Sequence, residues 1–188
     1  MSVMRALVIV DVQKDFCPGG ALPVPDGDGV VPVINRLMPL FPIVVATKDW
    51  HPQDSDHFES WPRHCIQGTA GAAFHDELET GGIDKLFLKG TSAQDDGYSG
   101  FEATNEDLEM YLKGKGVTSV VVVGLAADYC VKKTAIEAVQ RGFETSVVVE
   151  ATAGVNVSEG DTEAAFAEMK SKGVSLVHLQ DLPVESGS

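Results

Sequence analysis

The chain contains the run Ser119-Val120-Val121-Val122-Val123-Gly124-Leu125-Ala126-Ala127-Asp128-Tyr129-Cys130, which we interpret as a strand, a turn of small residues and the start of a helix. Four consecutive valines are typical of a strand covered on both faces, because a strand with one exposed face would alternate apolar and polar residues. Beyond the turn, apolar residues recur at helical spacing as far as Gly142, a residue type that favours a helix end. A buried strand followed directly by a helix indicates an α/β sheet.

The same alternation recurs along the rest of the chain. Further strands are predicted at Arg5–Asp11, Ile43–Thr47, Lys85–Leu88, Thr145–Val149 and Val174–Leu179. Helices are predicted from the apolar stripe Val30–Met38, from Leu108–Leu112 after an N-cap at Thr104, and from about Ser158 to Gly173. With right-handed crossovers, this order predicts a three-layer α/β/α fold around a mostly parallel, doubly wound sheet of about six strands. Since no linker or internal repeat interrupts the pattern, we expect one domain over residues 1–188.

Composition and charge narrow the class of partner. The chain has 188 residues, 44% of them hydrophobic, and a formal net charge of −14 with scattered Lys and Arg residues, so we expect no nucleic-acid partner. The apolar run Ala6–Val10 is too short for a membrane span, so we expect no membrane partner. The patterned segment with Cys17 and Gly19-Gly20 that follows this run disfavours a secretory leader. Three cysteines cannot all pair with one another, which favours free thiols in the cytoplasm. A neutral small molecule is the substrate class that this chain would not repel.

Three reactive side chains follow predicted strands. Asp11 completes the first strand, Lys89 follows the third, and Cys130 lies in the first turn of the helix after the fourth. The carboxyl ends of parallel strands meet at one edge, so we expect these groups to lie together as base, electrostatic partner and nucleophile. The positive end of the helix dipole would favour the Cys130 thiolate. Taken singly, the residues also suit a helix cap, a solvated amine and a buried structural thiol.

The stretch from Asp49 to about Gly82 is too long to be a mere connection, and loops of that size are usually functional. It gathers Asp49, His51, His57 and His64, with Cys65 as a softer alternative ligand ranked below His64. One carboxylate with two or three imidazoles suits one divalent metal ion: Zn²⁺, Fe²⁺ or Mn²⁺. A metal-free surface loop rich in histidine would show the same composition.

Several of these segments together resemble one family, the nicotinamidase/pyrazinamidase branch of the isochorismatase-like cysteine hydrolases. The resemblance is carried in chain order by Asp11-Val12-Gln13-x-Asp15-Phe16, Asp49-Trp50-His51-Pro52, Trp61-Pro62-x-His64-Cys65, Lys89-Gly90 and Gly124-Leu125-Ala126-x-Asp128-x-Cys130-Val131. The first, fourth and fifth segments are similar to the whole superfamily. The two histidine-containing segments are similar to the metal-bearing branch in particular.

The resemblance implies an isochorismatase-like fold and an enzyme that hydrolyses nicotinamide, and also pyrazinamide, through a cysteine thioester. It implies a triad of Asp11, Lys89 and Cys130, with an oxyanion hole formed by the backbone N–H groups of Ala126 and Cys130 after a cis Leu125–Ala126 bond. The implied metal ligands are Asp49, His51 and His64, with His57 as a fourth or water-bridged ligand. The implied ring-wall residues are Phe16, Trp61 and Tyr98, whereas Tyr129 receives no role.

Other functions remain open at this point. Another amidase of the same superfamily, acting on a carbamoyl or ureido compound, would keep the triad but generally lack the metal ligands. A thiol-based redox protein would use Cys130, although the chain has no C-x-x-C motif. A nucleotide-binding fold is disfavoured because Gly27-Asp28-Gly29 lacks a third glycine and does not directly follow a strand. The oligomeric state, the metal and the preference between the two amides are not predicted.

Overall fold

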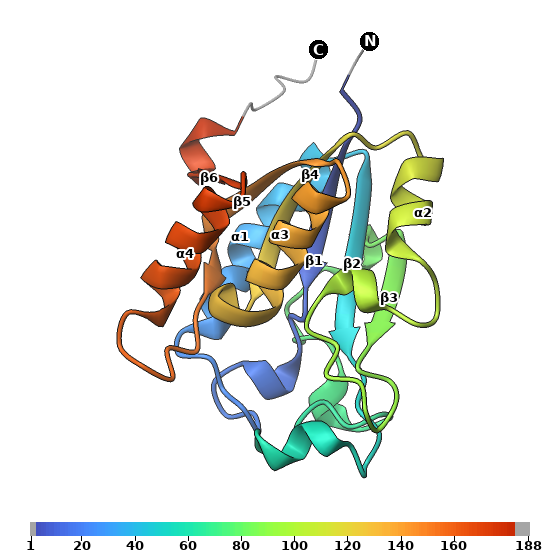
Figure 1. The fold of residues 1–188 in the computed structure, drawn as a ribbon, viewed down its shortest axis with the longest axis vertical. Helices are drawn as coiled ribbons and strands as arrows, with labels where there is room; N and C mark the ends of the chain where they lie inside the picture. Colours follow the sequence, from blue (N-terminus) through green and yellow to red (C-terminus); the bar gives the residue numbers. More distant parts are fainter. Residues whose placement is uncertain (1–2, 183–188) are drawn as a thin grey trace.

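The computed structural model describes residues 3–182, and its six strands form one sheet in the order β3-β2-β1-β4-β5-β6, with every neighbouring pair parallel (Figure 1). The expected doubly wound, mostly parallel sheet of about six strands is therefore confirmed, and the sheet is parallel throughout. The strands are β1 (Arg5–Val10), β2 (Ile43–Asp49), β3 (Lys85–Lys89), β4 (Ser119–Leu125), β5 (Glu144–Ala153) and β6 (Ser175–Val177).

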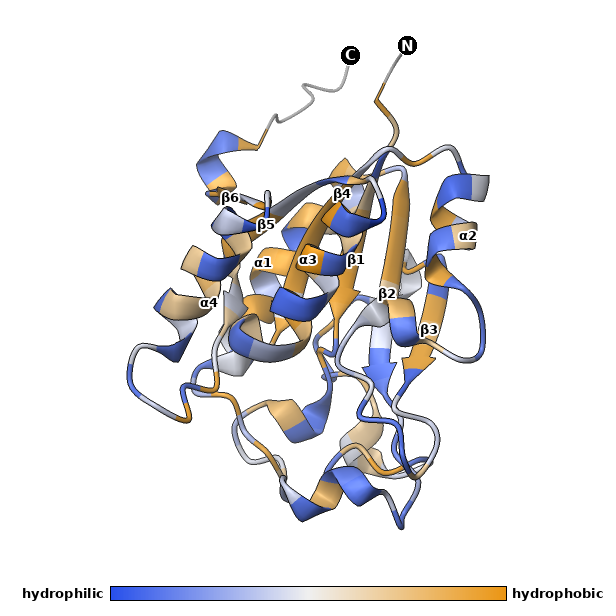
Figure 2. Ribbon diagram, viewed as in Figure 1, coloured by the Kyte–Doolittle hydropathy of each residue, from blue (hydrophilic) through white to orange (hydrophobic). Residues whose placement is uncertain are grey.

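Helices cover both faces of this sheet, as the continuous apolar runs required. Within the described residues the α-helices are α1 (Val30–Leu37), α2 (Leu108–Gly114), α3 (Lys132–Gln140) and α4 (Asp161–Ser171). Side chains of β1 alternate between two buried clusters: Leu7 and Ile9 pack in the cluster of α1, and Ala6 and Val8 pack in the cluster of α2, α3 and α4. Apolar colour accordingly fills the strands, while the outer helix faces are polar (Figure 2).

The strand order reverses at β1, which lies between β2 and β4. At such a reversal the connections leave the carboxyl edge on opposite sides, and ligands of α/β sheets bind there. The long connection between β2 and β3 lies beyond the strand tips at this edge (Figure 1) and contains short 3₁₀ turns at Asp56–Glu59, Ala70–Ala72 and Thr80–Gly82.

Some predicted boundaries were wrong. The N-cap of α2 is Asp107, whose carboxylate accepts a hydrogen bond from the Met110 amide at 2.9 Å, and Thr104 instead donates its amide to Leu88 at the sheet edge. Helix α4 begins at Asp161, because Gly160 adopts a left-handed backbone with φ of 87°. Strand β5 continues to Ala153 beyond its apolar run.

Among residues 3–182, no helix combines the length and the apolar character that crossing a bilayer requires.

Candidate active site

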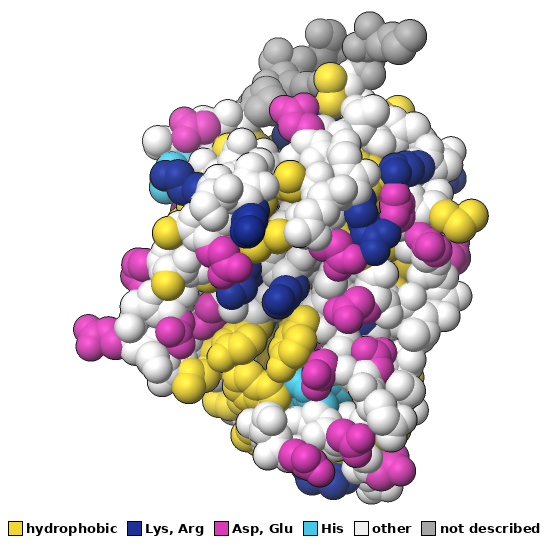
Figure 3. Space-filling model, viewed as in Figure 1, with side chains coloured by type: hydrophobic (Ala, Val, Ile, Leu, Met, Phe, Trp, Pro, Cys, Tyr) yellow, Lys and Arg dark blue, Asp and Glu magenta, His cyan; other side chains and the backbone are white. Residues whose placement is uncertain are grey.

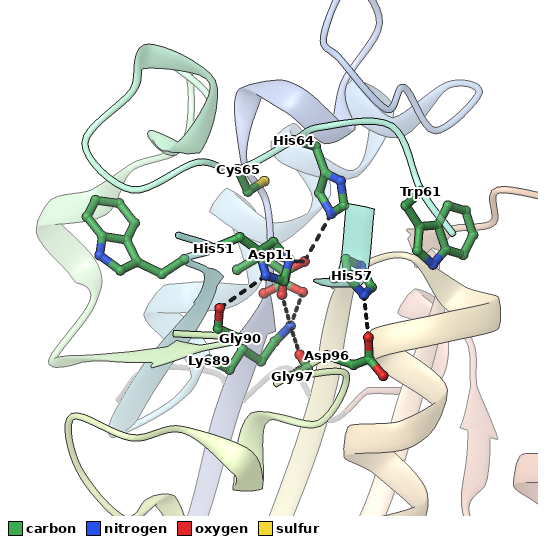
Figure 4. Close-up of polar contacts among 12 residues, drawn as sticks. Asp11, His51, His57, Trp61, His64, Cys65, Lys89, Gly90, Asp96 and Gly97 are labelled. Carbon is green, nitrogen blue, oxygen red and sulfur yellow. Dashed lines mark hydrogen bonds and ion pairs between the residues drawn. The ribbon is translucent and has the colours of Figure 1, made fainter. Parts of the chain in front are cut away.

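The ends of three strands bring Asp11, Lys89 and Cys130 into contact, as the sequence predicted (Figure 4 shows the first two). Asp11 directly follows β1, Lys89 is the last residue of β3, and Cys130 lies in the turn after β4. The Lys89 Nζ lies 2.7 Å from Asp11 Oδ2 and 3.4 Å from Cys130 Sγ. All three residues are buried, so this small cluster of charge is shielded from water.

Lys89 remains charged despite its burial because anions surround it. Its ammonium contacts the carboxylates of Asp11 and Asp49 and donates to the Gly97 carbonyl at 2.8 Å. Burial alone would lower the pKa of Lys89, but the two carboxylates outweigh burial and raise it well above the usual value. Lys89 is therefore a fixed positive charge rather than a proton carrier.

Asp11 presents an oxygen that can take a proton. Its Oδ1 accepts a hydrogen bond from the Thr47 hydroxyl at 2.7 Å, and its Oδ2 lies 2.7 Å from the Lys89 ammonium. Burial raises the pKa of Asp11, with Lys89 opposing that rise. The backbone of Asp11 has a φ of 50°, a left-handed conformation that non-glycine residues rarely adopt and that clusters at functional sites.

Cys130 lies in a single π-helical turn, Ala127–Val131, that continues into α3. The Leu125–Ala126 bond before it is cis, as expected. We expected the helix end to favour the thiolate, but burial, reinforced by Asp11 and Asp49, raises the pKa of Cys130 well above its usual value. The resting group is thus the thiol, and a nearby base is needed to activate it.

Three histidines of the long connection converge beside the triad. One ring nitrogen from each of His51, His57 and His64 lies within 4.8 Å of the other two. Asp49 Oδ2 lies 3.4 Å from His51 Nε2 and 3.7 Å from His64 Nε2. Burial would raise the pKa of Asp49, but Lys89, aided by these histidines, lowers it well below its usual range, so Asp49 is a carboxylate.

These four residues fit a divalent metal ion. Each imidazole places Nδ1 on an oxygen: His51 on the Gly90 carbonyl at 3.1 Å, His64 on the Pro62 carbonyl at 2.7 Å, and His57 on the carboxylate of Asp96 at 2.7 Å (Figure 4). Such partners fix the tautomer and leave Nε2 to coordinate. His51 Nε2 is buried and has no hydrogen-bond partner among the described residues, which is unfavourable unless an ion binds there.

A pocket joins the metal-ligand group to the thiol. Its walls include the predicted Phe16, Trp61 and Tyr98, and its lining also contains His57, His64 and Cys130. The indole N–H of Trp61 donates to the Tyr98 hydroxyl at 3.0 Å, so the two rings brace each other. Figure 3 shows a cluster of hydrophobic side chains beside a histidine on the lower half of this face.

Sequence patterns missed three residues of this wall. Tyr129 packs edge-on against Trp61 with ring centroids 5.0 Å apart, and Leu22 and Val155 complete the lining. The carboxylate of Asp128 holds the Val155 segment against the Cys130 turn by accepting from the Val155 amide at 2.9 Å. For Tyr129 the available signal was its position next to the predicted nucleophile Cys130, because both residues line the pocket.

Cys65 does not join the metal-ligand group. Its amide donates to the Asp15 carboxylate at 2.8 Å, and its thiol is buried. Burial raises the pKa of Cys65 well above its usual value, so its ranking below His64 as a ligand agrees with the structure. The thiols of Cys17, Cys65 and Cys130 are all free, as expected.

Residues 5–181 match the model of the isochorismatase domain. The chain is 46% identical to the nicotinamidase/pyrazinamidase of Mycobacterium tuberculosis, with 93% of this chain and 98% of that protein covered.

Two solved structures are similar in both fold and sequence. The pyrazinamidase of Pyrococcus horikoshii in complex with zinc is 41% identical with a TM-score of 0.84, covering 93% of this chain and 99% of that one. PnC1 from L. infantum in complex with nicotinate is 37% identical with a TM-score of 0.90, covering 97% of this chain and 96% of that one.

Proposed function

Since this chain belongs to the isochorismatase family and is a hydrolase of the nicotinamidase/pyrazinamidase kind, we propose that its triad hydrolyses nicotinamide, and also pyrazinamide, to the carboxylic acid and ammonia. The observation that carries the assignment of residues is the contact of Lys89 with both Asp11 and Cys130 at the floor of an aromatic pocket. A flat heteroaromatic amide suits this pocket, because its walls are rings and its floor carries the nucleophile.

Acylation begins with a proton transfer from the Cys130 thiol to the carboxylate of Asp11. The thiolate attacks the carboxamide carbon, and the carbonyl electron pair moves to the oxygen. The backbone N–H groups of Ala126 and Cys130 stabilise that oxyanion. When the carbonyl re-forms, the carbon–nitrogen bond breaks, and the nitrogen takes the proton from Asp11 and leaves as ammonia.

Deacylation repeats these steps with water. Asp11, again a carboxylate, takes a proton from a water molecule as its oxygen attacks the thioester carbon. The carbon–sulfur bond then breaks, and the Cys130 sulfur recovers the proton from Asp11. Throughout the cycle Lys89 keeps its charge and stabilises the anionic form of Asp11 or of Cys130.

The metal ligands contribute binding rather than a nucleophile. We propose that Asp49, His51, His57 and His64 hold one divalent ion, for which zinc in the Pyrococcus horikoshii relative is the supporting precedent and iron or manganese the alternatives. When bound, that ion supplies a Lewis acid able to hold the ring nitrogen of the substrate, directly or through water. Phe16, Trp61 and Tyr98 then hold the ring in place, so that the binding energy orients the carboxamide toward Cys130.

The experiment that tests this proposal is ammonia release from nicotinamide and pyrazinamide, run beside metal analysis of the same preparation. We expect turnover of both amides and about one ion per chain. Absence of ammonia from metal-loaded protein, with turnover of a carbamoyl or ureido compound instead, would overturn the proposed substrate.

A further inference from the structure

The three metal-binding histidines differ in what holds their outer nitrogens. His51 and His64 donate to neutral backbone carbonyls, whereas His57 donates to the carboxylate of Asp96. A carboxylate only accepts hydrogen bonds, so the proton of His57 must reside on Nδ1 and its Nε2 is the nitrogen left for a ligand. The side chain of Asp96 is 62% exposed, while that of His57 is 4% exposed. The exposed carboxylate of Asp96 thus holds the ring of the buried His57 through a hydrogen bond.

The His57 turn is docked against the segment that carries Asp96. The Asp56 amide donates to the Ala93 carbonyl at 2.8 Å, and the His57 ring stacks on His51 with centroids 4.7 Å apart. The Ser55 hydroxyl also accepts from the His57 amide at 3.3 Å. Because the backbone is already fixed by these contacts, the Asp96 bond is left to set the rotation of the imidazole.

The same segment, residues 90–98, reaches three other parts of the site. Its Gly90 carbonyl accepts a hydrogen bond from the His51 ring, and its Gly97 carbonyl accepts one from the Lys89 ammonium. Its Tyr98 hydroxyl accepts a hydrogen bond from the Trp61 indole. At Gly90 a side chain is excluded, because a Cβ would lie 2.5 Å from the His51 ring and the φ is +65°. Residues 90–98 therefore contact the metal ligands, the triad and the ring wall. Figure 4 shows Gly90, Asp96 and Gly97 of this segment.

We propose that Asp96 is a positioning residue that makes His57 a direct ligand of the divalent ion. The inference rests on the proposed metal site and deepens it: without Asp96 the imidazole can rotate or change tautomer, and the ion retains Asp49, His51 and His64. Residues that hold a ligating histidine in this way typically change metal affinity about 10- to 100-fold.

The test measures Zn²⁺ affinity by competition with a chromogenic chelator, using the full chain and no substrate. Asp96→Ala removes the hydrogen bond and should weaken Zn²⁺ binding about 10- to 100-fold, and Asp96→Asn, which keeps an acceptor oxygen, should lose less. Asp95→Asn is the matched control, because it removes the same charge from the same segment and the described hydrogen bonds do not include its side chain. We expect it to bind Zn²⁺ within about 2-fold of the parent, since a half-buried charge that makes no hydrogen bond to a ligand acts weakly at a distance.

A double-mutant cycle separates positioning from general disturbance of the loop. If Asp96 acts through His57, Asp96→Ala should have almost no further effect on Zn²⁺ affinity in a His57→Ala background. Equal losses from Asp96→Ala and Asp95→Asn, or a full loss from Asp96→Ala in the His57→Ala background, would overturn the proposal. We also expect each metal-free variant to unfold in urea at the same midpoint as the metal-free parent.

The outcome does not depend on the reaction. A parent chain that binds Zn²⁺ and responds to Asp96→Ala but releases no ammonia from nicotinamide would contradict the proposed substrate while supporting the role of Asp96. A parent chain that hydrolyses nicotinamide, but whose Zn²⁺ affinity is unchanged by Asp96→Ala, would support the proposed substrate and contradict the role of Asp96.

Discussion

Replacing Lys89 with methionine tests the electrostatic centre of the site. The side chains of Lys89 and Asp11 are 0% exposed and that of Asp49 is 4% exposed, so the substitution leaves two buried carboxylates without their shared cation. Removing one partner of a buried ion pair costs about 3–5 kcal/mol, because the remaining charge stays buried and unpaired. For a chain of this size that corresponds to a fall in Tm of roughly 6–20 °C.

The matched control is Lys85→Met on the same strand. Lys85 pairs with Glu106 at the surface, where both side chains are more than a third exposed, and such pairs contribute about 0–1 kcal/mol. Both variants should be unfolded in urea with a chelator present, so that metal binding does not add to the stability. Lys89→Met should shift the midpoint far more than Lys85→Met, and should lower kcat for nicotinamide about 100- to 1,000-fold. Equal midpoint shifts, or near-normal kcat in Lys89→Met, would refute the role given to Lys89.

Three further predictions concern the triad and the metal. Cys130→Ala should abolish turnover while leaving the fold intact, because no neighbouring hydroxyl or thiol can replace the nucleophile; activity above about a hundredth of the parent, with an unchanged circular dichroism spectrum, would falsify the thioester route. Asp11→Asn should lower kcat about 100- to 10,000-fold, since an amide neither takes the thiol proton nor delivers one to ammonia; a stopped assay for ammonia checks this, and near-normal kcat would remove Asp11 from the triad. Chelation should depress kcat/KM for nicotinamide much more than for benzamide, which lacks the ring nitrogen; equal use of both amides by the metal-loaded enzyme would contradict the anchoring role.

The fold could be predicted from the sequence because its strands are buried on both faces. The run from Val120 to Val123 has no polar interruption, so its burial on both faces follows from hydrophobicity alone. Strand ends were less predictable. Strand β2 continues through Lys48 and Asp49, which pair with Leu88 and Lys89, and β5 continues through Thr152, which pairs with Gly124 after a register shift.

The site was predictable where residue type alone selects chemistry. Asp11 and Cys130 follow strands and Lys89 ends one, so the parallel sheet places all three at the same edge. Asp96 and Val155 carry no such signal, because each reaches the site through a loop conformation that only tertiary contacts fix. The direction of the pKa shift of Cys130 was also beyond the sequence, because the burial and the neighbouring carboxylates that raise it exist only in the folded chain.

In the proposed mechanism, Cys130 carries the acyl group during turnover. The most direct measurement is acid quench of the enzyme during steady-state hydrolysis of nicotinamide, followed by mass spectrometry of its peptides. We expect a nicotinoyl adduct on Cys130, the thiol that contacts Lys89 and lines the pocket, and none on Cys17 or Cys65, which are not among the residues that line it. An adduct on Cys17 or Cys65, or rapid turnover with no adduct on any thiol, would contradict the proposed mechanism.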